Sequence, residues 1–160
     1  MATDRHPLRP VLETVGPESC PTKLNFHCHT LCSDGSLTPE ELIRQACDQG
    51  LSHLAVTDHH STAAFRLMQS WLGRDQHSNR SMPTLWSGME ISCVLRGCLV
   101  HVLALGFEID HPALQVYNQG DAAVGEPLRA ESVRKAIHDA GGLAVLAHPA
   151  RYRLGFQELI

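Results

Sequence analysis

The sequence predicts an α/β fold with a mainly parallel sheet. Short apolar runs alternate with amphipathic helical stretches in the order β-α-β-α-(β-β)-α-β. Such alternation is typical of parallel strands joined by crossover helices. A histidine or carboxylate ends several of the apolar runs. The chain has 160 residues, 43% of them hydrophobic, which suffices for one domain with a core.

The chain begins with a segment that lacks apolar periodicity. Residues 1–22 contain Pro7, Pro10, Pro17 and Pro21, and we expect them to form a flexible leader. The folded domain would then span residues 23–160. Residues 23–29 are predicted to form its first strand, so that two histidines, two positions apart, point to the same side.

The clearest helix is expected directly after residue 38. Thr38 is a good N-cap, Pro39 occupies the first helical position, and Glu41 completes a Thr-x-x-Glu capping box. Apolar residues at 42, 43 and 46 form one face, and Gly50 ends the helix.

The remaining elements follow from periodicity and from turn residues. Residues 54–57 are predicted to be a short buried strand, 62–72 a second helix and 73–82 a polar loop. Residues 85–92 and 99–107 indicate a hairpin with a turn near Arg96-Gly97. Residues 108–127 are expected to be irregular. A third helix should end at Gly141-Gly142, followed by a buried strand over 143–147.

Composition excludes several classes of protein. The net charge of −4 argues against a general polyanion-binding surface. No apolar stretch is long enough to span a bilayer, so no membrane partner is expected. Without a secretory signal, the six cysteines are expected to be reduced, and the location to be cytoplasmic.

The 11 histidines are the compositional anomaly. Because active-site residues of parallel α/β barrels gather at the carboxyl ends of the strands, the polar residues there should form one pocket. Imidazole and carboxylate groups are ligands for Zn²⁺, Mn²⁺ or Fe²⁺. Taken alone, Asp34 before Gly35 is also ordinary turn chemistry, and His101 inside an apolar run could be a core residue. The candidates are His27, His29, Asp58, His59, His60, Glu90, His101 and His148.

These residues lie in a set of motifs that resembles the PHP domain family, named for polymerase and histidinol phosphatase. The nearest subgroup is similar to small stand-alone phosphoesterases that act on nucleotide or RNA-end phosphates. The matching pieces are Asn25-Phe-His27-Cys-His29-Thr, Ser33-Asp34-Gly35, Leu37-Thr38-Pro39-Glu40-Glu41-Leu42, Ala55-Val-Thr57-Asp58-His59, Gly88-Met-Glu90-Ile-Ser92, His101 and Ala147-His148-Pro149.

The resemblance implies a distorted (β/α)₇ barrel that holds up to three divalent metal ions. His27, His29 and Glu90 would hold the first. Glu90 would bridge to a second, which His101 and His148 would also hold. Asp34 and His59 would hold the third. The resemblance further implies that Arg151, just after the His-Pro motif, contacts a substrate phosphate.

The resemblance implies metal-dependent hydrolysis of a small phosphorylated substrate, a nucleotide or an RNA end, by metal-activated water. His60 is our candidate for the general acid. Three departures from the family pattern are Asn25 and His60, where the family has Asp, and the lack of its late Gly-x-x-Asp-x-His ligands. The chain therefore corresponds to the N-terminal portion of the barrel, incomplete at the C-terminus. The alternative is a catalytically impaired module that binds metal, self-associates or docks on a partner chain that completes the barrel.

Overall fold

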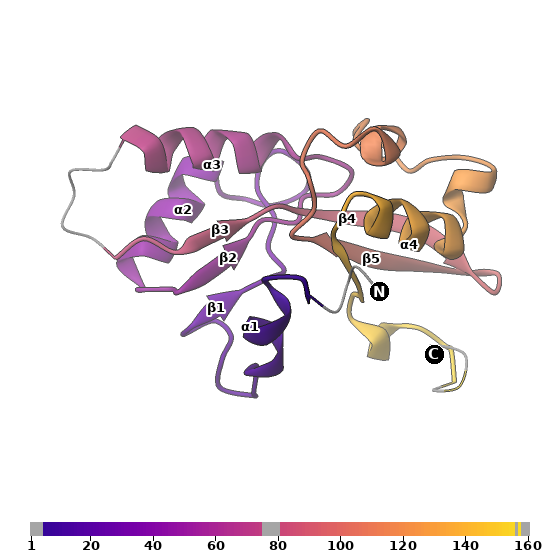
Figure 1. The fold of residues 1–160 in the computed structure, drawn as a ribbon, viewed down its shortest axis with the longest axis horizontal. Coiled ribbons are helices and arrows are strands. Elements are labelled where there is room, and N and C mark those ends of the chain that lie inside the picture. The colour runs from indigo at the N-terminus through magenta and orange to yellow at the C-terminus, as the bar shows by residue number, and fades with distance from the viewer. Residues whose placement is uncertain (1–4, 75–80, 156, 158–160) are drawn as a thin grey trace.

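The computed structural model describes residues 5–74, 81–155 and 157, which form two three-stranded sheets with helices packed on them (Figure 1). The first sheet is parallel, in the order β1-β2-β3, and the second is antiparallel, in the order β4-β5-β6. The elements in chain order are α1 (Arg9–Glu13), β1 (Leu24–Asn25), α2 (Pro39–Asp48), β2 (His53–Ala55), α3 (Ala63–Arg74), β3 (Thr84–Trp86), β4 (Gly88–Leu95), β5 (Cys98–Leu105), η2 (Pro112–Tyr117), η3 (Glu126–Leu128), α4 (Ala130–Asp139), β6 (Leu143–Leu146) and η4 (Pro149–Arg151). The α/β fold class is confirmed.

Helices α2 and α3 cover the parallel sheet. They pack against each other, and Ile43 and Met68 form a buried cluster with Leu54 of β2. Helix α2 begins as predicted. The Thr38 side chain accepts the backbone N–H of Glu41, and the Glu41 carboxylate accepts the backbone N–H of Thr38 at 2.8 Å.

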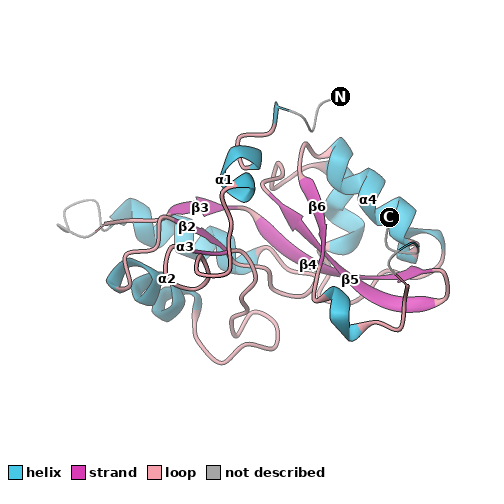
Figure 2. Cartoon of the chain, turned by 90° about the horizontal axis from the view of Figure 1, so that it is seen from below, coloured by secondary structure: helices cyan, strands magenta, loops and turns pink. Residues whose placement is uncertain are grey.

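The second sheet corrects the expectation of a mainly parallel arrangement. Strands β4 and β5 form the predicted hairpin, whose turn residues Arg96 and Gly97 both have positive φ angles, 49° and 79°. This combination is typical of a type I′ turn. Because the hairpin inserts β5 between β4 and β6, β6 is antiparallel to its neighbour. Helix α4 packs on this sheet, with Val133 and Ile137 buried (Figure 2).

The run predicted as one strand over residues 85–92 is two strands in different sheets. The break falls at Ser87, whose hydroxyl donates to the Phe107 carbonyl at 2.6 Å. The next position, Gly88, requires glycine, because a Cβ atom there would lie 2.3 Å from the Val56 carbonyl oxygen. The absence of a side chain lets β4 approach the end of β2 closely.

Strand β1 is shorter than predicted. It ends at Asn25, so His27 and His29 lie in the segment that follows the strand. The segment leaves the sheet because the Asn25 side chain accepts the backbone N–H of His27 at 3.0 Å, a local turn that competes with strand pairing.

The segment expected to be a flexible leader packs on the core, which corrects that expectation for residues 6–13. Leu8 is fully buried and contacts the cluster between the two sheets. His6 anchors it: its Nε2 lies 2.8 Å from the Gly106 carbonyl oxygen, and its Nδ1 accepts the backbone N–H of Leu8. Residues 1–4 lie outside the described part of the chain.

The two sheets meet where β3 leads into β4, and among the described residues they do not close into a barrel. Strands β1 and β6 are the outer strands. The complete (β/α)₇ arrangement is therefore not formed by these residues. Within the same residues, every helix is too short or too polar to cross a bilayer. Most of the predicted loop over residues 73–82 lies outside the described part.

Candidate metal centre

Backbone hydrogen bonds gather the polar residues at one end of the strands. The Glu90 N–H donates to the Asp58 carbonyl at 3.2 Å, and the His60 N–H donates to the Glu90 carbonyl at 3.1 Å. The Thr57 N–H donates to the Cys28 carbonyl at 2.8 Å. The segments after β1 and after β2 therefore lie side by side with the start of β4, and Glu90 reaches the cluster from near the beginning of its strand, not from the strand end expected from the sequence.

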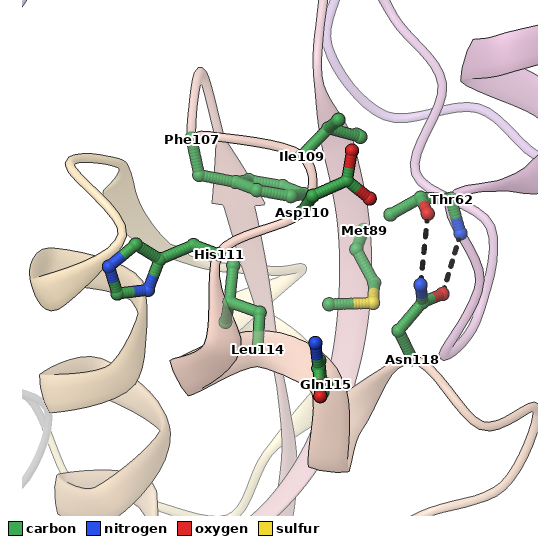
Figure 3. Close-up of a pocket in the computed structure, with 9 residues that line it drawn as sticks. All are labelled: Thr62, Met89, Phe107, Ile109, Asp110, His111, Leu114, Gln115 and Asn118. Atoms are coloured by element: carbon green, nitrogen blue, oxygen red, sulfur yellow. Dashed lines mark hydrogen bonds between the residues drawn. The ribbon is translucent and has the colours of Figure 1, made fainter.

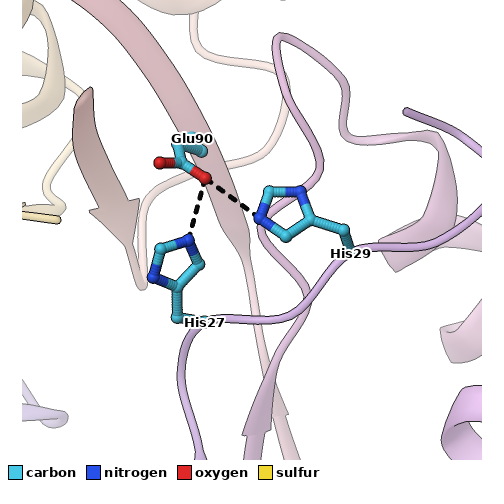
Figure 4. A group of neighbouring side chains, drawn as sticks. All are labelled: His27, His29 and Glu90. Carbon is cyan, nitrogen blue, oxygen red and sulfur yellow. Dashed lines mark hydrogen bonds and ion pairs between the residues drawn. The ribbon is translucent and has the colours of Figure 1, made fainter. Parts of the chain in front are cut away.

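The Glu90 carboxylate is the centre of this cluster, and its side chain is 1% exposed. Two histidines from the segment after β1 converge on one of its oxygens (Figure 4). His27 Nε2 lies 2.8 Å and His29 Nε2 lies 3.0 Å from Glu90 Oε2. A third imidazole, that of His59, lies 3.8 Å from the same oxygen.

The other carboxylate oxygen faces the second sheet. His101 Nδ1, from β5, lies 3.0 Å from Glu90 Oε1, and His148 Nε2, after β6, lies 3.1 Å from it. His148 has a left-handed backbone, with φ 32° and ψ 59°. This conformation is strained for a residue other than glycine, and such strain is concentrated at functional sites. Glu90 thus presents one oxygen to each half of the cluster.

Asp34 extends the cluster toward solvent. Its Oδ1 lies 3.1 Å from His29 Nδ1, its Oδ2 lies 3.7 Å from His59 Nε2, and its side chain is 69% exposed. The next position, Gly35, requires glycine, because a Cβ atom there would lie 2.3 Å from the backbone of His29. The tight turn therefore holds Asp34 beside His29 and His59.

Burial and charge act in opposite directions in this cluster. Burial would raise the pKa of Glu90, but hydrogen bonds from His27 and His29 outweigh burial and lower it. The same hydrogen bond to Glu90 raises the pKa of His29. Burial lowers the pKa of His101, although Glu90 opposes this shift. The carboxylate is therefore ionised, and the imidazole of His101 is neutral.

One nitrogen in the cluster lacks a hydrogen bond. His101 Nδ1 is buried and, among the described residues, is 3.0 Å from Glu90 Oε1 without the alignment that a hydrogen bond requires. An unpaired buried polar atom is costly. A cation between the imidazoles and the carboxylate would remove that cost, and imidazole with carboxylate is a donor set for Zn²⁺, Mn²⁺ and Fe²⁺. The residues present thus fit a divalent cation.

Three trios in the described part of the chain have ligand atoms within 4.8 Å of one another: His27, His29 and Glu90; His29, Asp34 and His59; and His59, Glu90 and His101. The first is a set expected from the sequence, and the second adds His29 to the expected pair of Asp34 and His59. In the third, His59 stands where His148 was expected. The geometry thus brings all seven expected metal ligands to one centre, with His148 at Glu90 Oε1.

His60 is placed differently from its neighbours, and the structure does not favour it as a general acid. Its side chain is buried, with Nδ1 3.2 Å from the Tyr117 carbonyl oxygen and Nε2 3.2 Å from the Ser92 N–H. A carbonyl only accepts and an amide N–H only donates, so these partners fix a neutral ring with its proton on Nδ1. Burial also lowers the pKa of His60. The one ring proton is donated to the Tyr117 carbonyl and does not face the cluster.

Arg151, the expected phosphate contact, is exposed on η4. It lines a surface groove that adjoins the cluster through His101. The other lining residues are Cys98, Leu99, Tyr152 and Arg153. The groove therefore connects two guanidinium groups to the edge of the histidine cluster.

A second, smaller pocket lies around Met89 (Figure 3). Its volume is about 50 Å³, and two hydrogen bonds between Thr62 and Asn118 border it. Asp110, at its rim, forms an ion pair with Arg66. This pocket has room for little more than water and does not open onto the cluster residues.

Two residues support the cluster in a way that the sequence did not indicate: Asp58, which was a candidate without a defined role, and Tyr152, which was not a candidate. Asp58 is fully buried, and its carboxylate accepts the Thr30 N–H at 2.6 Å and the hydroxyls of Thr30 and Ser33 at 2.7 and 2.6 Å. These bonds hold the segment that carries His29. The position of Asp58 directly after an apolar run is a sequence signal that could have indicated this supporting role. Tyr152 lies four positions after His148, outside the last motif, and carried no signal in the sequence.

The chain is similar to known proteins in sequence and in fold. The PHP domain family matches residues 25–123. The 5'-3' exoribonuclease Rnm of Escherichia coli is 30% identical over 141 residues, which cover 80% of this chain and 47% of that protein. The 3',5'-nucleoside bisphosphate phosphatase of Chromobacterium violaceum is 34% identical over 91 residues, 57% of this chain and 30% of that protein. A solved amidohydrolase from Chromobacterium violaceum, with bound sulfate and no metal, superposes with a TM-score of 0.70 at 21% identity, covering 86% of this chain and 70% of that one.

The fold and the cluster define an α/β protein with a centre of histidine and carboxylate side chains, contributed by β4, β5 and the segments that follow β1, β2 and β6. The family match covers more than half of the chain, and the chain belongs to the PHP domain family. It spans 47% and 30% of the lengths of the exoribonuclease and the phosphatase.

Proposed function

We propose that the chain is a metal-dependent phosphoesterase that hydrolyses a phosphate ester of a nucleotide or an RNA end. The observation that carries the proposal is the buried Glu90 carboxylate with five imidazoles within 3.8 Å of its two oxygens. The names of the exoribonuclease and the bisphosphate phosphatase support it.

In this proposal the ligand sets are those that the family resemblance implied, with His29 added to the third. His27, His29 and Glu90 would hold a first ion. His101, His148 and Glu90 would hold a second, so Glu90 belongs to both sets. Asp34 and His59, together with His29, surround a third position. We expect Mn²⁺, Zn²⁺ or Fe²⁺ because all three accept imidazole and carboxylate ligands.

The chemistry divides between the ions and the protein. Bound cations supply a water of lowered pKa and neutralise charge on the phosphate. Glu90 remains ionised and sets the spacing of the two halves of the cluster. Asp58 fixes the segment that carries His29, and His60 holds the end of β2 against β4 without exchanging a proton.

Arg151 contributes to substrate binding in this proposal. Its groove adjoins His101, so a phosphate held by the guanidinium would lie beside the metal centre. A guanidinium offers several N–H donors that match phosphate oxygens. With a net charge of −4, the chain would engage the end of a nucleic acid or a single nucleotide rather than a long backbone.

The testing experiment substitutes the bridging residue. Glu90→Gln keeps the shape of the side chain but removes its charge, so the two halves of the cluster lose their shared ligand. We expect the wild-type chain to retain two or more divalent ions and to hydrolyse a generic phosphomonoester with added Mn²⁺. The variant should retain one ion or none and lose turnover, as measured by elemental analysis and phosphate release.

The matched control is Glu131→Gln on α4, where the carboxylate is 67% exposed and far from the cluster in sequence and fold. It makes the same chemical change and should leave both metal content and turnover unchanged. Equal metal content in wild type and Glu90→Gln would contradict the ligand assignment.

A second candidate function is a metal-binding module that docks on a partner or self-associates. The observation that favours it is the open sheet, in which β6 is an outer strand with the apolar sequence Leu-Ala-Val-Leu. Outer strands with unpaired backbone groups pair readily with another chain. Metal uptake without turnover, together with a dimer in light scattering, would favour this candidate over the enzyme.

A further inference from the structure

The Tyr152 side chain connects β5 to the segment after β6 at the edge of the cluster. It follows η4, and its hydroxyl oxygen lies 2.8 Å from the backbone nitrogen of His101 and 3.0 Å from Nδ1 of His148. His148 in turn has Nε2 3.1 Å from Glu90 Oε1. One hydroxyl group therefore touches two residues that both reach the same carboxylate oxygen.

The Tyr152 hydroxyl occupies the position where a backbone carbonyl of the neighbouring strand would normally accept a hydrogen bond. The Ala147 N–H donates to the His101 carbonyl at 3.0 Å, as in an antiparallel ladder that continues beyond β6. The reciprocal N–H of His101 donates to the Tyr152 hydroxyl. The chain turns out of the ladder at His148, whose φ is 32°, and Tyr152 replaces the lost carbonyl acceptor.

The directions of these hydrogen bonds follow from what each group can do. The His101 N–H can only donate, so the Tyr152 oxygen accepts there. Glu90 is ionised and can only accept, so His148 donates to it from Nε2. Nδ1 can then accept a hydrogen bond, and the Tyr152 O–H donates to it.

The same hydroxyl can also orient His148 when a metal ion is bound. When His148 binds a cation through Nε2, its ring carries the proton on Nδ1 and needs an acceptor there. The second lone pair of the Tyr152 oxygen provides one, while the first keeps the His101 N–H. A group that both donates and accepts thus orients His148 in either state, which is the usual role of a partner behind a metal-binding histidine.

We propose that Tyr152 is the positioning residue of the site formed by Glu90, His101 and His148, and that its hydroxyl sets which nitrogen of His148 faces the carboxylate. The inference rests on the proposed metal centre. It assigns Tyr152 no contact with substrate.

The test compares Tyr152→Phe with Tyr117→Phe. Tyr117 is a matched control, since its hydroxyl also bonds a backbone group, donating to the Pro127 carbonyl at 2.9 Å, but touches no histidine side chain through that hydroxyl. Zn²⁺ is titrated into each metal-free protein by calorimetry. Tyr152→Phe should weaken one Zn²⁺ equivalent by about 10–100-fold, the range typical of such partners, and leave the others unchanged. Tyr117→Phe should match wild type.

A double-mutant cycle separates positioning from a general structural role. His148→Ala should weaken the same equivalent, and adding Tyr152→Phe to it should cause a smaller loss than Tyr152→Phe causes in the wild type, because the bond between the two side chains is already gone and only the bond to the His101 N–H remains. Additive losses would overturn the inference, as would a Tyr152→Phe isotherm that overlays wild type. A wild-type chain that takes up no Zn²⁺ would overturn the proposed metal centre and this inference with it.

A second measurement needs no variant. In ¹⁵N-histidine NMR spectra, the His148 ring should carry its proton on Nε2 in the metal-free wild type and on Nδ1 after Zn²⁺ is added. A ring that stays a mixture of both forms in the metal-free protein would overturn the role assigned to the hydroxyl.

Discussion

His59 and His60 are adjacent in sequence but have different partners. His59 Nε2 lies 3.8 Å from Glu90 Oε2, whereas both nitrogens of His60 bond to backbone groups. A left-handed φ of 51° at His60 separates the two side chains. The sequence placed both at a strand end, with His59 as a metal ligand and His60 as the general acid. It could not show that the His60 ring turns away, because a backbone dihedral decides which ring faces the cluster.

His60 leads to a prediction on stability. His60→Ala leaves the Ser92 N–H and the Tyr117 carbonyl without their partner, and we expect a loss of about 1–3 kcal/mol in the free energy of unfolding. Urea unfolding measures this loss. Retention of metal by the folded variant would agree with a supporting role, whereas full stability with lost turnover would restore the general-acid hypothesis. His138→Ala, on α4, is the control and should change stability little.

Elements with a local signal were predicted well, and those defined by distant pairing were not. The capping box of α2 and the hairpin turn at Arg96-Gly97 are encoded within a few residues, and both are present. The split between β3 and β4 at Ser87 depends on a hydrogen bond to Phe107, twenty positions away. The sequence of residues 85–92 does not indicate this split, because the residues on either side of Ser87 both favour a strand.

Helix α2 provides a test at this scale. Thr38→Ala removes the hydroxyl that accepts the Glu41 N–H, and we expect a loss of about 1 kcal/mol in the free energy of unfolding. Thermal or urea unfolding measures the loss. Thr38→Ser keeps the hydroxyl and should stay within a few tenths of a kcal/mol of wild type. A similar loss in both variants would show that the cap is not the cause.

The arrangement of the whole molecule depends on a residue outside the predicted domain. Leu8 is fully buried in the cluster that includes Ala55 of β2 and Leu103 of β5, one from each sheet. The segment was expected to be flexible because its prolines hide any periodicity. Its order comes from contacts with distant residues, including the bond between His6 and Gly106.

Removing this contact should affect the entire fold. Leu8→Ala creates a cavity between the two sheets, and we expect a loss of about 2–5 kcal/mol in the free energy of unfolding. Leu67→Ala on α3, where Leu67 is 54% exposed, is the control and should cost far less. If Leu8→Ala unfolded at the same urea concentration as wild type, the N-terminal segment would not be part of the cooperative unit.

The sequence by itself determined the α/β class, the helices α2, α3 and α4, and the residue types of the proposed metal centre. Each of these depends on local periodicity, on capping or on motifs that can be recognised in the linear sequence. The tertiary structure alone decided that Glu90 presents one oxygen to each half of the cluster, that His60 turns away, and that Tyr152 supports His148. The physical reason is that hydrogen-bond geometry between distant segments depends on strand register and backbone dihedrals, which periodicity does not specify.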